Sequence, residues 1–234
     1  MTLARTVLAG TAATAALAGF LAAAVGVAWV TGLQRDLPDH MQLAEWRPAV
    51  GTTIRASDGS VMGRHAAQFR RFVPFSEIPR HVVDAFVAAE DKDYWRHAGV
   101  DPLAVARAAL SNVKAAGRRP EGGSTITQQV VKNLLVGAER SLDRKVREAL
   151  VALRADRDIG KERILEIYLN EIYFGSGAYG VAAAAETYFG LDLRALGPAE
   201  AALLAGLPKA PSAANPFTSP SRAEARRAYV LGRM

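Results

Sequence analysis

A run of amides, hydroxyls and one cation follows two glycines near the middle of the chain. Residues 122–133 read Gly-Gly-Ser-Thr-Ile-Thr-Gln-Gln-Val-Val-Lys-Asn. Ser124 stands where a helix N-cap is expected, and the residues after it predict an amphipathic helix. A solvent-facing helix would normally mix Glu and Lys, so its polar side predicts a wall that binds a polar, anionic ligand. The polar side chains that share this side are Thr125, Gln128, Gln129 and Lys132.

A carboxylate ends an apolar stretch further upstream. Glu90 follows Val82, Val83, Phe86 and Val87, whose spacing predicts a buried helix face. A carboxylate at the edge of a core is partly desolvated and can serve as a general base or acid. The alternative is a surface carboxylate without a chemical role, which is the commoner case for such a stretch alone.

His97 lies in the same stretch, and taken alone it is more often a hydrogen-bonded structural histidine than a catalyst. Neither it nor any carboxylate cluster shows metal-ligand spacing, so no protein metal site is predicted.

Two cations and a carboxylate fall together on a later helix. Arg144, Lys145 and Glu148 are neighbours at i, i+3 and i+4 spacing. One interpretation is a solvated surface salt bridge, worth less than about 1 kcal/mol. The other is a second polar wall beside the Gln-Gln-Lys helix, because Arg and Lys together suit a diphosphate. The stripe predicted to be buried on this helix is Leu142, Val146, Ala149, Leu150 and Leu153.

Composition separates the first 33 residues from the rest. No charged residue occurs from Thr6 to Gln34, and about 20 apolar residues suffice to span a bilayer. A cleaved signal peptide is the alternative, but its apolar core is usually only about 7–15 residues. Residues 1–33 are therefore expected to be a retained anchor.

The balance of charge and the lack of cysteine narrow the function classes. The chain has 29 Lys and Arg against 23 Asp and Glu, a net charge of +6. Such a surface attracts anionic headgroups or phosphates, although ordinary solubility explains the net charge equally well. There is no cysteine, which excludes disulfides, thiolate metal sites and a cysteine nucleophile.

The soluble part is predicted to be mainly α-helical. Residues 34–75 form an expected juxtamembrane linker with a β-hairpin at Asp58-Gly59, and residues 76–234 form the helical domain. Asp101 and Ser141 are predicted N-caps, and Gly160 is a predicted helix stop. Further helices are expected over three ranges: 178–189, 198–207 and 220–234.

Ordered motifs resemble one enzyme family. They are Glu-Asp-x-x-aromatic-x-x-His-x-Gly from Glu90, Gly-Gly-Ser-Thr-Ile-Thr-Gln-Gln-x-x-Lys-Asn from Gly122, Arg-Lys-x-x-Glu from Arg144 and Tyr-x-Asn-x-x-Tyr-Phe-Gly from Tyr168. This order resembles the peptidoglycan glycosyltransferases, the transglycosylase family of class A penicillin-binding proteins and monofunctional transglycosylases. The resemblance implies a lysozyme-like, two-lobed helical domain tethered by one transmembrane helix.

The resemblance also implies roles for particular residues. Glu90 would be the general base and Glu148 the second essential carboxylate, with Arg144 and Lys145 steadying a diphosphate. No cofactor is required, although a divalent cation such as Mg²⁺ could share the charge of the diphosphate. The substrate-binding residues implied by the motifs are Asp91, His97, Ser124, Thr125, Gln128, Gln129, Lys132, Asn133, Arg140, Arg144 and Lys145.

The family implies a substrate, partners and a location. Lipid II would be polymerised into β-1,4 glycan with release of undecaprenyl diphosphate, at the periplasmic side of the bacterial inner membrane. The growing glycan chain and other cell-wall synthesis proteins would be partners, and nucleic acid would not. We expect no transpeptidase domain here; a truncated class A protein and a short monofunctional enzyme both remain open. A lysozyme-like hydrolase and a non-catalytic scaffold are the competing functions.

Overall fold

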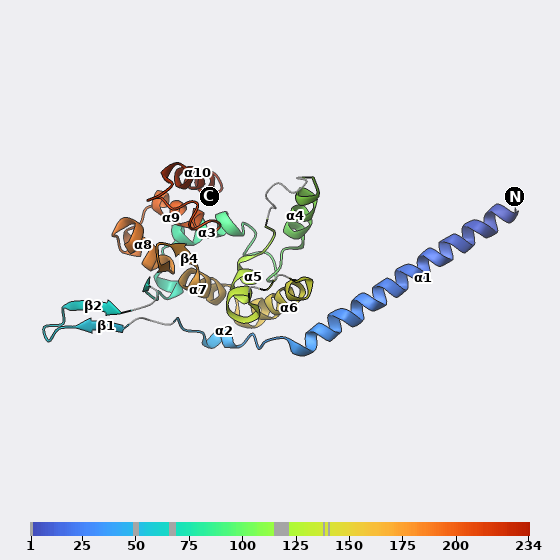
Figure 1. The fold of residues 1–234 in the computed structure, drawn as a ribbon, viewed down its shortest axis with the longest axis horizontal. Helices are drawn as coiled ribbons and strands as arrows, with labels where there is room; N and C mark the ends of the chain where they lie inside the picture. The colour runs from blue at the N-terminus through green and yellow to red at the C-terminus, as the bar shows by residue number, and fades with distance from the viewer. Residues whose placement is uncertain (1, 49–51, 66–68, 115–121, 138, 140) are drawn as a thin grey trace.

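The fold is a helical domain from which one long helix and one β-hairpin project in different directions (Figure 1). It was obtained as a computed structural model, which describes residues 2–48, 52–65, 69–114, 122–137, 139 and 141–234. The expected fold class is confirmed: the domain is mainly α-helical, with a two-stranded hairpin and one apolar helix at the N-terminus.

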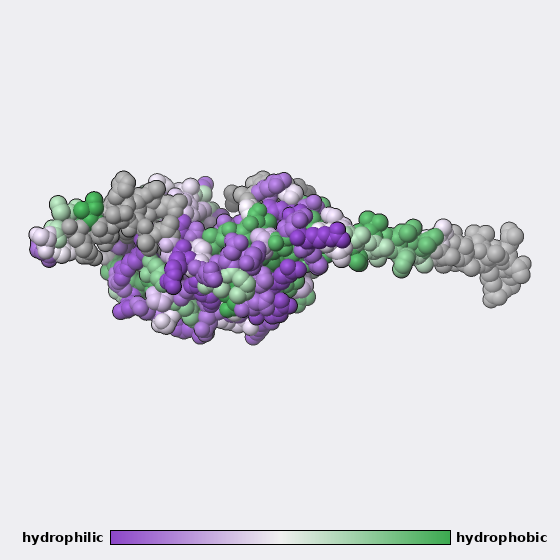
Figure 2. Space-filling model, turned by 90° about the horizontal axis from the view of Figure 1, so that it is seen from below, coloured by the Kyte–Doolittle hydropathy of each residue, from purple (hydrophilic) through white to green (hydrophobic). Residues whose placement is uncertain are grey.

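Helix α1 (Thr2–Leu33) extends away from the domain. Its part from Thr14 runs into the next turn as a 23-residue stretch, Thr14–Asp36, long and apolar enough to cross a membrane. Figure 2 shows this stretch as a hydrophobic rod beside a mainly hydrophilic domain surface. Near its end, Trp29 Nε1 donates to Asp143 Oδ1 at 3.1 Å, which joins α1 to the start of α6.

The segment expected to be a linker packs against the domain. It contains η1 (Gln34–Asp36) and α2 (Gln42–Glu45), and Leu43 of α2 is buried in the core. His40 Nε2 lies 2.8 Å from Asp158 Oδ2, and Arg163 donates to the carbonyl oxygens of Ala44 and Trp46. These contacts hold the start of the chain against α6 and α7.

The predicted hairpin is present. Strands β1 (Thr52–Arg55) and β2 (Val61–His65) pair antiparallel around Asp58-Gly59. Gly59 has φ +84°, a conformation that glycine adopts at no steric cost. The Asp58 carboxylate accepts from Ser60 N at 2.8 Å and closes the turn.

The remaining helices build the domain around α3. In chain order they are η2 (Phe75–Glu77), α3 (Arg80–Glu90), α4 (Pro102–Lys114), α5 (Ile126–Val131), η3 (Lys132–Val136), α6 (Leu142–Ile159), α7 (Lys161–Glu171), α8 (Val181–Phe189), η4 (Leu193–Ala195), α9 (Pro198–Gly206) and α10 (Pro220–Leu231). Asp101 accepts from Ala104 N and Ser141 from Arg144 N, so both predicted caps are confirmed. Gly160, at φ +88°, separates α6 from α7 as predicted.

A small second sheet was not predicted. Strand β3 (Phe69–Arg70) pairs parallel with β5 (Ala178–Tyr179), which pairs antiparallel with β4 (Tyr173–Gly175). The helix expected over 178–189 therefore begins at Val181. Gly177 and Gly180 both have positive φ, and this interrupts the helical path before α8.

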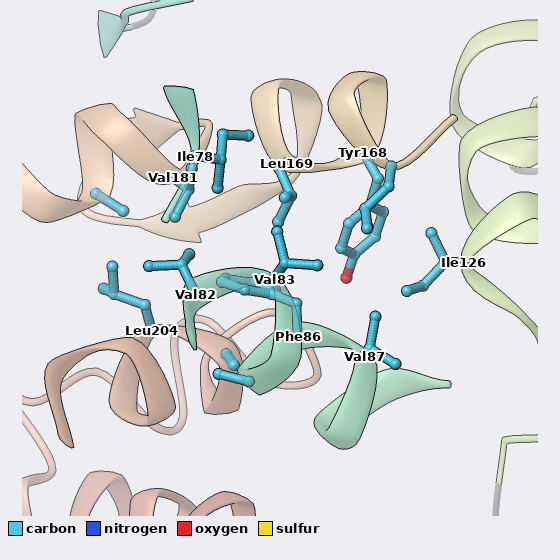
Figure 3. Packing of buried hydrophobic residues seen from close by; sticks show 14 of the residues in the cluster. Ile78, Val82, Val83, Phe86, Val87, Ile126, Tyr168, Leu169, Val181 and Leu204 are labelled. Carbon is cyan, nitrogen blue, oxygen red and sulfur yellow. The ribbon is translucent and has the colours of Figure 1, made fainter. Parts of the chain in front are cut away.

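The hydrophobic core surrounds α3, whose apolar side chains are almost fully buried (Figure 3). Phe86 packs edge-on against Tyr168 of α7, with ring centroids 6.3 Å apart, and against Phe174 at 5.8 Å. Small side chains from α8 and α9 complete the core and allow these helices to approach closely. Because Glu90 is the last residue of α3, this packing fixes the position of its backbone.

The buried stripe predicted for α6 was wrong. Leu142 and Leu153 are exposed, whereas Glu148, Val151, Ala152 and Ala155 are buried. The helix is turned so that small residues face α5 and α7 and a carboxylate enters the interior. That orientation is possible because Arg144 and Lys145 both pair with Glu148.

Gly99 shows where close packing requires glycine. It has φ +84°, and a Cβ there would lie 2.3 Å from the backbone oxygen of Ala152 in α6. Gly177 has φ +77° with no atom within 4 Å of its Cβ position. We expect Gly177→Ala to cost about 1–2 kcal/mol of backbone strain, which lowers the thermal unfolding midpoint by about 2–8 °C.

Gly99→Ala should lower the midpoint further, because α6 must move away as well. Thermal unfolding of both variants in detergent measures the difference. Equal midpoints would show that α6 accommodates a methyl group at position 99.

Candidate functional site

A cleft of about 410 Å³ opens where α3 ends. Its walls come from opposite parts of the domain, because α4 and the segment before α5 line one side and residues around α9 and α10 line the other. Figure 1 shows α4 set apart from α9 and α10 in this way. The lining residues are Ala89, Glu90, Asp91, Lys92, Asp101, Ala104, Arg107, Ala108, Gly122, Gly123, Ser124, Gln129, Lys132, Lys209, Tyr229 and Arg233.

Glu90 is half-buried at the floor of this cleft. Gln129 of α5 donates from Nε2 to Glu90 Oε2 at 3.0 Å, which holds the carboxylate in one orientation. A carboxylate with one oxygen fixed by a neutral donor keeps lone pairs that can accept a proton. Glu90 therefore has the placement that a general base needs.

Asp91 joins the end of α3 to the start of α5. Its buried carboxylate accepts from Ile126 N at 3.0 Å and from His97 Nε2 at 2.9 Å. Lys161 Nζ lies 3.4 Å from His97 Nδ1, and an ammonium can only donate, so the His97 proton sits on Nε2 and faces Asp91. His97, expected to bind substrate, does not line the cleft, and its contacts are with Asp91 and Lys161 inside the domain.

Two further charged side chains, Lys161 and Asp156, lie beyond His97 inside the domain. Lys161 pairs with Asp156 at 2.7 Å, and Thr127 donates to Asp156 at 3.2 Å. Lys161 also lies over the ring of Tyr94, whose hydroxyl donates to the Lys161 carbonyl oxygen. Burial, with the charge of Asp156, raises the pKa of Tyr94, so it remains a donor. We call Asp91, His97, Lys161 and Asp156 the buried network; the sequence patterns considered above did not reveal its last two members.

The N-cap of α5 is Thr125, one residue later than predicted. Thr125 and Gln128 form a capping box: each backbone N–H donates to the side-chain oxygen of the other, at 3.1 Å. The Thr125 hydroxyl also donates to the Gly99 carbonyl oxygen at 2.6 Å. Both side chains are buried, so of the expected polar wall only Gln129 and Lys132 line the cleft.

Ser124 does not cap α5, and its side chain instead contacts a residue of a charged cluster beside the cleft. We call Arg144, Lys145 and Glu148 the cation–glutamate cluster. Lys145 Nζ lies 2.7 Å from Ser124 Oγ and also binds Glu148, while Arg144 Nη1 lies 2.6 Å from the other oxygen of Glu148. Glu148 is only 1% exposed, so the solvated surface pair does not describe this cluster. A buried carboxylate between two cations fixes both side chains beside the rim of the cleft.

Asn133, another expected site residue, is not among the described residues that line the cleft. Asn133 is exposed in η3, which continues α5 as a π-helical turn closed by Gly137 N bonding to Lys132 O. Such turns often occur at functional sites. Arg140 lies outside the described residues. Within the described ranges, no group of three or more His, Asp or Glu side chains could hold a metal ion.

Several cations that line the cleft were not predicted from the sequence. They come from elements that are distant along the chain: Lys92, Arg107, Lys209 and Arg233. Arg233 lies over the Tyr229 ring and donates to its hydroxyl at 2.6 Å, so the end of α10 forms a fixed cationic edge. The available signal was the composition of residues 226–233, which contain three arginines and one tyrosine.

Comparison with known proteins shows the family of this chain. Residues 58–234 match the family described as Transglycosylase. Penicillin-binding protein 1A of Aquifex aeolicus (strain VF5) is 50% identical over 202 residues, covering 86% of this chain and 28% of that protein. Penicillin-binding protein 1A of Rickettsia felis (strain ATCC VR-1525 / URRWXCal2) is also 50% identical over 202 residues, covering 86% and 26%. The chain thus spans about a quarter of the length of these relatives.

A solved structure is also similar. The crystal structure of penicillin-binding protein 1A from Haemophilus influenzae aligns with a TM-score of 0.44 and 30% identity, covering 81% of this chain and 18% of that one.

The corrected cap makes a prediction about stability. Thr125→Ala removes the N-cap, which typically costs about 0.5–2 kcal/mol, and leaves the N–H of Gln128 without its partner. Ser124→Ala removes only the contact with Lys145 and should change the unfolding free energy by less than about 0.5 kcal/mol. Denaturant unfolding of both variants compares them. A larger loss for Ser124→Ala would make Ser124 the cap.

Proposed function

The chain belongs to the transglycosylase family, and from this premise we propose that it is a membrane-anchored peptidoglycan glycosyltransferase that polymerises lipid II. The observation that carries the proposal is a single cleft that contains a fixed carboxylate, Glu90, and is bordered by cations on several elements. A base and an anion-binding surface are the two components that transfer from a sugar diphosphate requires.

In the proposed reaction Glu90 takes the proton from the 4-hydroxyl of the acceptor GlcNAc. That oxygen attacks the anomeric carbon of the donor MurNAc, and the bond from this carbon to the diphosphate breaks. Undecaprenyl diphosphate leaves, and the α linkage is replaced by a β-1,4 linkage with inversion. Diphosphate is a good leaving group, so the enzyme must stabilise negative charge rather than supply a strong acid.

The charge distribution of the cleft supports this assignment. Among the described residues, its lining has five cations and three carboxylates, counting Lys and Arg against Asp and Glu. Lys145 contacts Ser124 at the rim of the cleft, and Glu148 holds both Lys145 and Arg144 in place. We assign Lys132, Arg144 and Lys145 to the donor diphosphate, and Glu148 to the positioning of Arg144 and Lys145. A divalent cation such as Mg²⁺ could share the charge of the diphosphate; we propose no protein site for it.

A lipid-linked substrate requires access from a membrane. Helix α1 supplies a candidate anchor, and Leu103, Leu110 and Val113 are exposed apolar residues on one side of α4, which lines the cleft. We propose that the domain works at the periplasmic face of the bacterial inner membrane. The growing glycan chain is its second substrate, other cell-wall synthesis proteins are candidate partners, and nucleic acid is not.

Two other functions are less well supported. A lysozyme-like hydrolase uses paired carboxylates and water, and it has no need of a cationic donor side. A non-catalytic scaffold would not need Glu90 and Glu148 to be held by specific donors, as both are.

The assignment of the base predicts the effect of Glu90→Gln. This change keeps the shape of the side chain but removes the proton acceptor, so polymerisation of lipid II should fall by about 100-fold or more. Glu224→Gln is the matched control, because Glu224 is exposed on α10. Consumption of lipid II by purified protein in detergent is the measurement.

Three outcomes of that assay count against parts of the proposal. Full activity of Glu90→Gln would remove Glu90 as the base. Cleavage of preformed glycan without consumption of lipid II would favour the hydrolase. Neither reaction by the unaltered protein would favour the scaffold.

The assignment of the cations predicts the effect of Lys132→Ala. Loss of a fixed positive charge from the cleft should lower kcat/KM for lipid II at least about tenfold, because charge on the leaving diphosphate is no longer stabilised. Arg80→Ala removes the same charge from a side chain that is 78% exposed at the far end of α3. Equal kinetics for both variants would show that Lys132 does not act on the substrate.

A further inference from the structure

The hydroxyl of Tyr168 is buried in the core without a hydrogen-bond partner among the described residues. Tyr168 lies on α7 and is 2% exposed, and its ring packs edge-on against Phe86. A buried hydroxyl that makes no hydrogen bond is unfavourable, and phenylalanine would fill the same space without that cost. The choice of tyrosine therefore calls for an explanation beyond packing.

The hydroxyl is directed at the junction of α3 and α5. Figure 3 shows it pointing away from α7, toward Val87 and Ile126. Val87 O accepts from Asp91 N at 2.9 Å, and Ile126 N donates to Asp91 Oδ2 at 3.0 Å. Tyr168 thus reaches, from the core side, the turn at which Glu90 and Asp91 leave α3.

The electrostatic surroundings keep the hydroxyl of Tyr168 protonated. Burial raises the pKa of Tyr168 well above its ordinary value, and the negative charge of Glu90, followed by that of Asp91, adds to this effect. Tyr168 therefore keeps its proton. Both oxygens of Asp91 already accept from His97, and one also accepts from Ile126. Glu90 accepts from Gln129 at Oε2 and has lone pairs left for a second donor.

We propose that Tyr168 is a positioning residue for Glu90, whose carboxylate receives a hydrogen bond from the Tyr168 hydroxyl in the substrate complex. Gln129 donates from α5 and Tyr168 from the core, so the remaining lone pairs of the carboxylate are directed toward the acceptor sugar. Catalytic hydrogen bonds often shorten only in the substrate complex. The inference rests on the proposed function, because it assigns Tyr168 to the same base.

The test compares Tyr168→Phe with Tyr94→Phe. Both tyrosines are buried, but the Tyr94 hydroxyl donates to Lys161 O at 2.8 Å. Tyr168→Phe should leave the thermal unfolding midpoint unchanged or raise it, while Tyr94→Phe should lower it by several degrees. In the lipid II assay, Tyr168→Phe should lower kcat about tenfold with little change in KM, as expected for a lost hydrogen bond to a charged group.

The pH profile separates positioning from a merely structural role. Without the hydroxyl, the ionised form of Glu90 loses a donor, so the acidic limb of kcat/KM should move to higher pH in Tyr168→Phe and not in Tyr94→Phe. The other charged residues that line the cleft within the described part of the chain are the same in both variants: Asp91, Lys92, Asp101, Arg107, Lys132, Lys209 and Arg233. The shift can therefore be assigned to the Tyr168 hydroxyl.

A double-mutant cycle completes the test. If Tyr168 acts through Glu90, Tyr168→Phe should have no further effect on the residual rate of Glu90→Gln. Unchanged kcat and pH profile in Tyr168→Phe would overturn the inference, and so would a fall in kcat accompanied by a lower unfolding midpoint and an unmoved acidic limb. Failure of the unaltered protein to consume lipid II would instead refute the proposed function.

Discussion

The carboxylate of Asp91 is the contact on which the site depends. It binds the first backbone N–H of α5 and the ring of His97, and so joins the end of α3 to the beginning of α5. Lys161 and Asp156 extend the buried network on the other side of His97. A buried carboxylate is tolerated only when its lone pairs are satisfied, and here the donors are His97 and Ile126. As a consequence Glu90, the residue before Asp91, meets Gln129, one turn into α5.

In the glycine-rich motif, residues 122–133, some polar side chains stabilise α5 and others line the cleft. Thr125 and Gln128 use their hydrogen-bonding capacity to cap α5, whereas Gln129 and Lys132 are free to line the cleft. A wall built in this way is rigid, because the groups that face the ligand stand on a helix whose first turn is held by the capping box and by Asp91. The cation–glutamate cluster repeats the principle on α6, where buried Glu148 fixes two cations.

Features encoded by neighbouring residues could be predicted from the sequence, and long-range features could not. The caps at Asp101 and Ser141 and the Asp58-Gly59 hairpin depend on local hydrogen bonds and backbone conformation. The orientation of α6 differs from the prediction because ion pairs with two cations allow Glu148 to be buried. The periodicity of apolar residues gives no indication of such ion pairs. The β3–β5 pairing and the arrival of Lys209 and Arg233 at the cleft require segments more than 100 residues apart to meet.

The contact between Trp29 and Asp143 determines where Arg144 and Lys145 lie relative to the membrane. Asp143 immediately precedes Arg144 and Lys145, and a helix rises only about 1.5 Å per residue. Tryptophan near the end of a spanning helix typically sits at headgroup level. With α1 in the bilayer, the two cations would stand in the same layer as the phosphates of the lipids. Under the proposed function, the hydrocarbon tail of the donor would then remain in the bilayer throughout the reaction, and only the sugars would need to enter the protein.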